Sequence, residues 1–322
     1  MHASQCSHFA GTVKHQPHIQ ANGAQAGAEQ NWRGIARLGM LVALVAGSSR
    51  QLLKPWHSWL IALSLTLFAS ASARASDTPY RLYPALDATT MGVSAAVWWV
   101  PSLFPGSFAA ADGCVCKASS LNPLDRPVAG IWDAGYSITG ELLIASVYTL
   151  TVLFDLLDVV KADEPFASFL VDMVVMAEAV LLNGALNQIA KLAIARPRPL
   201  LYERELDHPR QSDPDSYLSF YSAHTSSAFA LTLAYAQTFA YRHPDSPYRF
   251  LVYAGAVLVS GAIGVSRIAA GKHFPSDVLV GAAAGAAVGL AIPWLHRNDQ
   301  SVQLSVSAMP GGVGVSLTIQ HL

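Results

Sequence analysis

Long apolar runs separated by short polar segments dominate the second half of the chain. Runs of this length predict helices, because strands are seldom so long. We expect helices over residues 138–160, 167–193, 226–241, 248–265 and 278–294, the last with Pro275 in its first turn. An earlier apolar stretch over 83–104 contains Trp98 and Trp99 and is interrupted by Pro101. That stretch favours an interfacial or half-inserted segment over a complete span.

The composition of the chain indicates that these helices are membrane segments. Of the 322 residues, 52% are hydrophobic and 13% are charged, and the mean hydropathy is +0.34. This is too apolar for an ordinary soluble enzyme and indicates several membrane-embedded helices. The formal net charge of −1 gives no basic surface, so we expect no nucleic-acid partner. The predicted fold is therefore all-α, a multi-helix bundle embedded in a membrane.

The N-terminal residues predict processing rather than a folded domain. Residues 1–49 show no helical or strand period, so we interpret them as disordered or as lying upstream of a later start such as Met40. Residues 50–75 run from basic through apolar to small, which is the order of a secretory signal peptide. Its apolar core is shorter than the ~20 residues needed to cross a bilayer. We therefore expect the mature chain in the periplasm or inner membrane of a bacterium.

The remaining chain divides into three predicted parts. Residues 76–134 form a periplasmic or interfacial segment, 135–297 form the helical bundle, and 298–322 form a tail. Alternating apolar and polar positions around Pro310-Gly311-Gly312 predict a β-hairpin in that tail. In an oxidising compartment Cys114 and Cys116 could form a strained disulfide or bridge to another chain, and a loop constraint is the favoured reading.

Candidate chemistry gathers between the last two predicted helices. Arg267 ends one helix, His273 lies at the corner, and Asp277 follows four residues later in the next first turn. At that spacing the carboxylate can accept the imidazole N–H and raise the basicity of the other ring nitrogen. The guanidinium of Arg267 offers a planar set of donors suited to a phosphate. His273 is therefore a candidate nucleophile or base.

Two further polar patches are expected on the same side of the membrane. Lys191 and Arg198 follow the end of one helix, and Ser222-Ala223-His224 opens the next. Counting helices as alternating crossings places these patches beside the Arg267 to His273 corner. Together they would form a cationic cradle, completed by a helix N-terminus, for a tetrahedral oxyanion. Taken singly, each residue also has an ordinary structural interpretation, such as a snorkelling cation, a helix cap or a buried neutral imidazole.

In these motifs the chain resembles the type 2 phosphatidic acid phosphatase superfamily, which includes vanadium-dependent haloperoxidases. The three matching segments are Lys191-x6-Arg198-Pro199, Ser222-Ala223-His224, and Ser266-Arg267-x5-His273-x3-Asp277. The family usually has Pro-Ser-Gly-His in the second motif, where this chain has Tyr221-Ser222-Ala223-His224. Ala223 keeps the backbone donor that glycine would offer and adds a methyl group beside the phosphate.

The resemblance implies a mechanism and a role for each site residue. His273 would attack phosphorus to form a phosphohistidine, with Asp277 orienting it, and His224 would protonate the leaving alcohol and then activate water. The phosphoryl oxygens would be held by five groups, namely Lys191, Arg198, Ser222, Ala223 and Arg267. No metal or other cofactor is required by this scheme.

Three functions remain open from the sequence. The first is a membrane phosphatase acting on a lipid phosphate or diphosphate, and the second is a haloperoxidase-like oxidoreductase that holds vanadate on His273. The third is a non-catalytic membrane protein that retains the bundle. A cleaved signal followed by a complete span over 83–104 would place the site in the cytoplasm, whereas a segment that does not span would place it in the periplasm. Basic residues in the connections opposite the site favour the periplasmic active site in the bacterial inner membrane. The individual lipid and the oligomeric state are not specified by the sequence.

Overall fold

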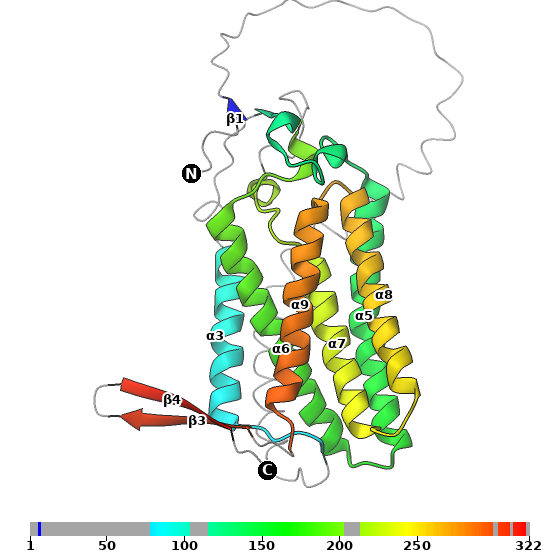
Figure 1. The fold of residues 1–322 in the computed structure, drawn as a ribbon, viewed down its shortest axis with the longest axis vertical. Helices are drawn as coiled ribbons and strands as arrows, with labels where there is room; N and C mark the ends of the chain where they lie inside the picture. The colour runs from blue at the N-terminus through cyan, green and yellow to red at the C-terminus, as the bar shows by residue number, and fades with distance from the viewer. Residues whose placement is uncertain are drawn as a thin grey trace, which may run out of the picture. The chain divides into compact units, whose positions relative to one another are not determined.

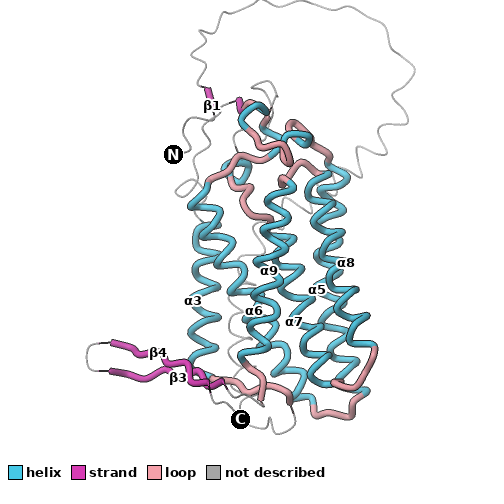
Figure 2. Tube along the Cα trace, viewed as in Figure 1, coloured by secondary structure: helices cyan, strands magenta, loops and turns pink. Residues whose placement is uncertain are grey.

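The computed structural model describes residues 78–103, 115–202 and 213–298, together with the backbone of 6–7, 302–309 and 312–319. The α-helices within these residues are α3 (Pro84–Leu103), α5 (Ala134–Lys161), α6 (Phe166–Ile194), α7 (Ala223–Arg242), α8 (Tyr248–Ala269) and α9 (Pro275–Leu295). They pack side by side as a bundle, and the loops that carry the sequence motifs gather at one end (Figures 1 and 2). The predicted helical bundle is confirmed.

Four of these helices are long and apolar enough to cross a membrane, namely α5, α6, α8 and α9. This supports the expectation of a membrane protein. The predicted helix positions agree with the structure to within a few residues at most ends. The expected signal peptide at 50–75 lies outside the described residues, as do most of the expected N-terminal residues 1–49.

The segment expected to be half-inserted is instead one regular helix. α3 runs for 20 residues, and Pro101 lies within its last turn, two residues before the helix ends at Leu103. The helix lies against α6 (Figure 1). At the contact, a Cβ on Gly184 would come within 2.2 Å of the Trp98 ring. The bundle therefore begins before residue 135, since α3 is part of it.

Local sequence explains where the helices begin. The carboxylate of Asp133 accepts the Tyr136 N–H at 2.9 Å and caps α5. Pro275 occupies the first turn of α9, and Asp277 Oδ2 accepts the N–H of Phe274, the residue before that helix, at 2.9 Å. Ser222 precedes α7, and its hydroxyl oxygen accepts the Thr225 N–H at 3.4 Å.

Backbone-to-backbone packing joins α7 and α9. The glycines at 281, 285 and 289 lie one turn apart on α9 and face successive turns of α7. A Cβ at Gly285 would lie 2.1 Å from the Ser226 carbonyl oxygen, and one at Gly289 would lie 2.5 Å from that of Ala230. Small residues at this spacing allow close approach of two helices inside a membrane. We call these three glycines the glycine seam.

Replacing Gly285 by alanine should therefore destabilise the bundle. Alanine favours a helix by about 1 kcal/mol, but the new methyl group would overlap a backbone oxygen that cannot move without shifting α7. We expect a net loss of roughly 2 kcal/mol, within the usual range for overpacking. Thermal unfolding in detergent would measure it. Gly261→Ala on α8 is the matched control, because a Cβ there meets nothing within 4 Å; equal melting temperatures for the two variants would contradict the seam.

A buried ion-pair cluster closes the opposite end of the bundle. Arg242, at the end of α7, binds Asp158 at 2.8 Å and Glu164 at 3.1 Å, and also pairs with Asp172 of α6. Its side chain is only 2% exposed. The cluster ties α5, α6 and α7 together, and it removes Arg242 from the basic residues that face solvent at this end.

The strands and cysteines complete the fold. The C-terminal hairpin is confirmed: β3 (Val302–Met309) and β4 (Gly312–Ile319) pair antiparallel, with Met309 opposite Gly312. A second pair joins β1 (Cys6–Ser7) to β2 (Val115–Cys116). Cys116 is buried, and Cys114 lies outside the described residues, so the suggested disulfide between them stays a prediction.

Candidate active site

His273 lies in the short turn between α8 and α9. Gly271 allows this turn because it adopts a φ of 67°, which disfavours other residues. The imidazole is 2% exposed, and its Nδ1 lies 2.7 Å from the carbonyl oxygen of Ser219. A carbonyl can only accept, so Nδ1 carries the proton and Nε2 presents a lone pair. This is the tautomer that a histidine nucleophile requires.

Asp277 does not contact His273 in the way that the spacing predicted. Its Oδ2 lies 3.9 Å from His273 Nδ1, too far for a hydrogen bond. The same oxygen accepts the Ser219 hydroxyl at 2.6 Å and the Phe274 N–H at 2.9 Å. The prediction of a direct carboxylate–imidazole bond was therefore wrong, because Asp277 turns back toward the start of its own helix.

Ser219 connects the two residues instead. Its hydroxyl donates to Asp277, and its carbonyl accepts from His273. On the other side, Asp277 Oδ1 receives Arg196 Nη1 at 2.5 Å, and Arg196 Nη2 also binds Asp125 at 2.7 Å. Asp277 thus positions the imidazole through Ser219, inside a buried network that includes a cation.

The three predicted cations lie near enough to His273 to affect its pKa. Burial lowers the pKa of His273 well below its ordinary value, and the positive charges of Arg198, Lys191 and Arg267 lower it further, in that order. Electrostatic effects of this kind require these groups to be near one another. The imidazole therefore stays neutral at neutral pH, ready to attack rather than to donate a proton.

The cations differ in how they are held. Asp215 holds Arg198 in place. Arg198 Nε donates to the Asp215 backbone carbonyl at 2.9 Å, and Arg198 Nη2 donates to the Asp215 carboxylate at 2.7 Å. Lys191 lies in the last turn of α6, where its carbonyl accepts the Ala195 N–H at 2.9 Å, and no hydrogen bond or ion pair joins its amine to another described residue. The buried Arg267 Nε also has no hydrogen-bond partner there. Both groups retain donors for an anion.

The start of α7 adds neutral donors. Ser222 is fully buried, and its hydroxyl oxygen accepts the Thr225 hydroxyl at 2.9 Å, which leaves its own hydrogen for another acceptor. Ala223 occupies the first helical position, where the N–H has no acceptor within the helix. The Ser222 N–H donates to the Asp277 carbonyl at 3.1 Å. This bond ties the start of α7 to the start of α9.

Glu141 of α5 joins the remaining two predicted residues. Its Oε2 lies 2.9 Å from His224 Nε2, and its Oε1 lies 3.3 Å from Arg267 Nη1. Arg267 Nη1 also donates to the Ser137 carbonyl at 3.2 Å. Close packing supports this arrangement, since a Cβ at Gly140 would lie 2.7 Å from Arg267 Nη1. One carboxylate thus holds both the candidate acid His224 and the candidate phosphate-binding residue Arg267.

Comparison with known proteins places this arrangement in a family. Residues 172–301 match the model of the PAP2 superfamily. The chain carries a PAP2 domain. All eight predicted site residues lie within it.

Comparisons with solved structures and with curated proteins add less information about this chain. A solved structure titled "Crystal structure of the first transmembrane PAP2 type phosphatidylglycerolphosphate phosphatase from Bacillus subtilis" aligns with 72% of this chain and 92% of that one, at 20% identity and a TM-score of 0.37. No curated protein matches the chain in sequence.

Sequence reasoning missed Glu141 and Ser219. Glu141 lies before the matched PAP2 region, on a helix that supplies none of the three motifs. Glu141 could have been noticed as a carboxylate inside an otherwise apolar helix. Burying a charged residue in a membrane is energetically costly, so such residues usually belong to a functional site. Ser219 gave no signal, since it acts through its backbone carbonyl as well as its hydroxyl.

Glu141→Gln should lower kcat by roughly 10-fold to 100-fold, the range typical of residues that orient a reacting group. Glutamine has one acceptor oxygen, so it cannot hold both His224 and Arg267. Phosphate release from detergent-solubilised protein would measure the change. Asp163→Asn, in the exposed turn after α5, is the control. Wild-type kcat and KM in the Glu141 variant would show that this carboxylate has no positioning role in the PAP2 domain.

Proposed function

We propose that this chain is a membrane phosphatase that hydrolyses a lipid phosphate or diphosphate monoester through a phosphohistidine at His273. One observation carries the proposal. The His273 imidazole is buried and neutral, and its hydrogen bond to the Ser219 carbonyl keeps the proton on Nδ1. Three cations lie close enough to lower its pKa. This is the combination of nucleophile and oxyanion cradle that phosphoryl transfer needs.

In the first step, His273 Nε2 forms a bond to phosphorus while the bond from phosphorus to the lipid oxygen breaks. His224 donates a proton to the departing oxygen. In the second step, water attacks the phosphohistidine, His224 takes the proton from that water, and inorganic phosphate leaves with the imidazole restored. Lys191, Arg198 and Arg267 stabilise the phosphoryl oxygens in both steps, assisted by Ser222 and the Ala223 N–H. The scheme uses no metal ion.

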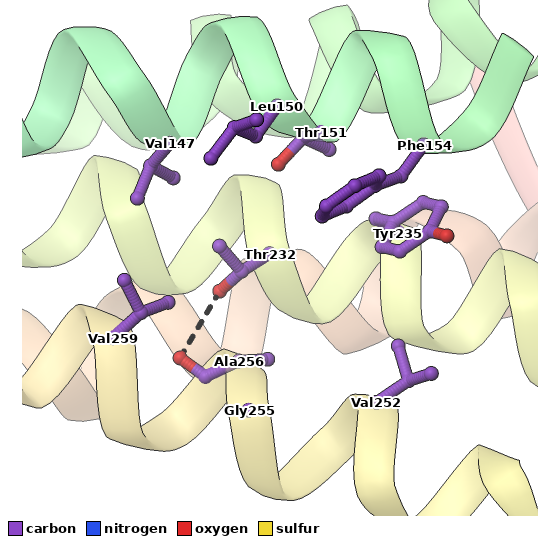
Figure 3. Close-up of a pocket in the computed structure, with 10 residues that line it drawn as sticks. All are labelled: Val147, Leu150, Thr151, Phe154, Thr232, Tyr235, Val252, Gly255, Ala256 and Val259. Carbon is purple, nitrogen blue, oxygen red and sulfur yellow. Dashed lines mark hydrogen bonds between the residues drawn. The ribbon is translucent and has the colours of Figure 1, made fainter. Parts of the chain in front are cut away.

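An apolar cavity supports a lipid substrate. It has a volume of about 340 Å³ and lies between α5, α7 and α8 (Figure 3). The lining is almost wholly apolar and is formed by Val147, Leu150, Thr151, Phe154, Thr232, Tyr235, Val252, Gly255, Ala256 and Val259. Its one drawn hydrogen bond joins Thr232 to the Ala256 carbonyl (Figure 3). This volume falls within the usual range of ligand pockets, about 300–1,000 Å³.

The same three helices carry Glu141, His224 and Arg267. Thr232 follows His224 by eight residues on α7, and Val259 precedes Arg267 by eight residues on α8, which corresponds to about 12 Å along each helix. An acyl chain lying in the cavity would therefore point its head group toward the cationic cradle. The cavity gives this site a reason to prefer a lipid over a soluble phosphomonoester.

A substrate panel on the purified full chain tests the proposal. The panel contains phosphatidic acid, phosphatidylglycerol phosphate, a polyprenyl diphosphate, phosphorylated lipid A and a soluble phosphomonoester, each without added Mg²⁺. We expect phosphate release from at least one lipid, at a higher kcat/KM than from the soluble ester. Vanadate-dependent halide oxidation would favour the oxidoreductase instead. Absence of both activities in folded protein would favour a non-catalytic role.

We further propose that the chain is a bacterial inner-membrane protein whose site faces the periplasm. In this orientation α3, which begins at the end opposite the site, starts in the cytoplasm, so residues 50–75 would not act as a cleaved signal peptide. The opposite end carries Lys161, Arg249 and Arg297, which favours the cytoplasm for that end. Arg242 adds little, because it is buried among carboxylates. Single cysteines introduced within 203–215 should react with a membrane-impermeant reagent added to intact spheroplasts. Labelling only after lysis would reverse the orientation.

A further inference from the structure

Two carboxylates and a histidine converge inside the bundle, well away from His273. Asp87 lies in the first turn of α3, Glu178 lies within α6, and His296 directly follows α9. All three are at most 5% exposed. His296 Nε2 lies 3.3 Å from Asp87 Oδ1 and 3.3 Å from Glu178 Oε2, and one ligand atom from each residue lies within 4.8 Å of the other two.

The hydrogen bonds around this triad aim acceptors at its centre. His296 Nδ1 lies 2.9 Å from the Ile292 carbonyl oxygen, so Nδ1 carries a proton, and Nε2 is the ring nitrogen that faces both carboxylates, with Asp87 Oδ1 at 3.3 Å. Glu178 Oε2 is buried and has no hydrogen-bond partner among the described residues. Asp87 is held from behind, where its Oδ2 accepts the Tyr83 N–H at 2.7 Å.

We propose that Asp87, Glu178 and His296 bind a divalent transition-metal ion, with Zn²⁺ as the best-matched candidate. Zinc accepts imidazole and carboxylate ligands at about 2.0–2.2 Å, and two ligands at the tetrahedral angle are then about 3.3–3.5 Å apart. The observed separations of 3.3 Å from His296 Nε2 match that edge. A backbone carbonyl on the far nitrogen is the usual partner of a metal-binding histidine.

Geometry and charge both disfavour a proton as the sole occupant. A charge-assisted N–H···O bond is normally about 2.7–2.9 Å long, and one N–H on Nε2 can point at only one of the two carboxylates. Within the described part of the chain, the ion pairs of Asp87 and Glu178 both go to His296, with no lysine or arginine involved. One proton would leave a net negative charge buried, whereas a divalent cation neutralises both carboxylates.

The ion would have a structural role. It would join α3, α6 and the end of α9, next to the bond by which Arg81 N–H donates to the His296 carbonyl at 2.7 Å. His296 lies 19 residues beyond Asp277 along α9, which corresponds to about 28 Å. The site is therefore separate from the proposed phosphatase chemistry, which needs no metal.

Metal content and thermal stability test this site together. The full chain in detergent is stripped with a chelator, incubated with Zn²⁺ alone or Mn²⁺ alone, desalted and analysed by elemental mass spectrometry. We expect about one tightly bound Zn²⁺ per chain. Stripping should lower the melting temperature by about 5–10 °C, and Zn²⁺ should restore it.

Variants decide whether the triad binds the ion. Glu178→Gln and Asp87→Asn preserve side-chain volume and should each weaken Zn²⁺ binding at least about 10-fold. His243→Gln is the matched control, because His243 lies at the same end and pairs with Asp158, outside the triad. Equal Zn²⁺ binding by the control and both triad variants would overturn the proposal. So would a wild-type chain that binds no ion and keeps its melting temperature after stripping, a result that needs no variant to fold.

Discussion

Replacing His273 by alanine should lower phosphate release at least about 10³-fold, because the substitution removes the only group proposed to bond to phosphorus. The cationic cradle would remain, so substrate should still bind and KM should change much less than kcat. The side chain is buried, and its one hydrogen bond to the described residues runs from Nδ1 to the Ser219 carbonyl. Its loss should therefore leave the fold intact. Initial rates on the best lipid of the panel would measure the effect.

Two comparisons make this result specific. His243→Ala removes a histidine at the other end of the bundle, where His243 Nε2 lies 2.8 Å from Asp158, and should keep wild-type activity. In wild-type protein, rapid quenching with a labelled phosphate substrate should trap phosphorylated protein that is stable in alkali and labile in acid, whereas the His273 variant should trap none. Wild-type turnover in the variant would exclude the phosphohistidine mechanism, while leaving the PAP2 fold unaffected.

Arg267→Lys should reduce kcat/KM by about 10²-fold to 10³-fold even though the charge is kept. Removal of one preorganised donor to a developing oxyanion typically has an effect of this size. The guanidinium bonds Ser137 and Glu141 through Nη1 alone, so its Nε remains for the phosphoryl group. Lysine has a single charged nitrogen and cannot serve both sides at once.

Arg249→Lys is the control for this change. It lies in the first turn of the same helix, where Arg249 donates to the Pro244 carbonyl far from the site. Rates on the soluble phosphomonoester should fall by a similar factor to rates on the lipid, because Arg267 is proposed to hold the phosphoryl group and not the tail. A loss confined to lipid substrates would instead assign Arg267 to binding the lipid.

The helices could be predicted because long apolar runs leave little choice of structure. The errors occurred where a polar residue or a proline was read as a boundary. α8 continues through Ser266 and Arg267 to Ala269. The Ser266 hydroxyl donates to the Ile263 carbonyl of the same helix, and Arg267 donates to the Ser137 carbonyl of α5, so neither side chain ends the helix. α3 includes Pro101 in its last turn, where the missing N–H removes one backbone hydrogen bond, and the helix ends two residues later.

Only the site residues that belong to linear sequence motifs could be predicted. Residues that offer a charged or nucleophilic side chain stand out in sequence, and the structure gathers Lys191, Arg198, Arg267, His224 and His273. Contacts between distant segments leave no such mark. Asp125 reaches Arg196 across 71 positions, and Glu141 reaches His224 across 83. The spacing of His273 and Asp277 suggested a hydrogen bond between them, but Asp277 Oδ2 instead accepts the Phe274 N–H and caps α9.

The glycine seam also constrains how a substrate can enter. Because α7 and α9 meet backbone to backbone, separating them would break a continuous interface and drag His224 away from His273. Entry of a lipid from the bilayer between α7 and α9 is therefore disfavoured. The cavity between α5, α7 and α8, lined by Leu150 and Phe154 among others, offers a route that leaves the contact between α7 and α9 closed (Figure 3).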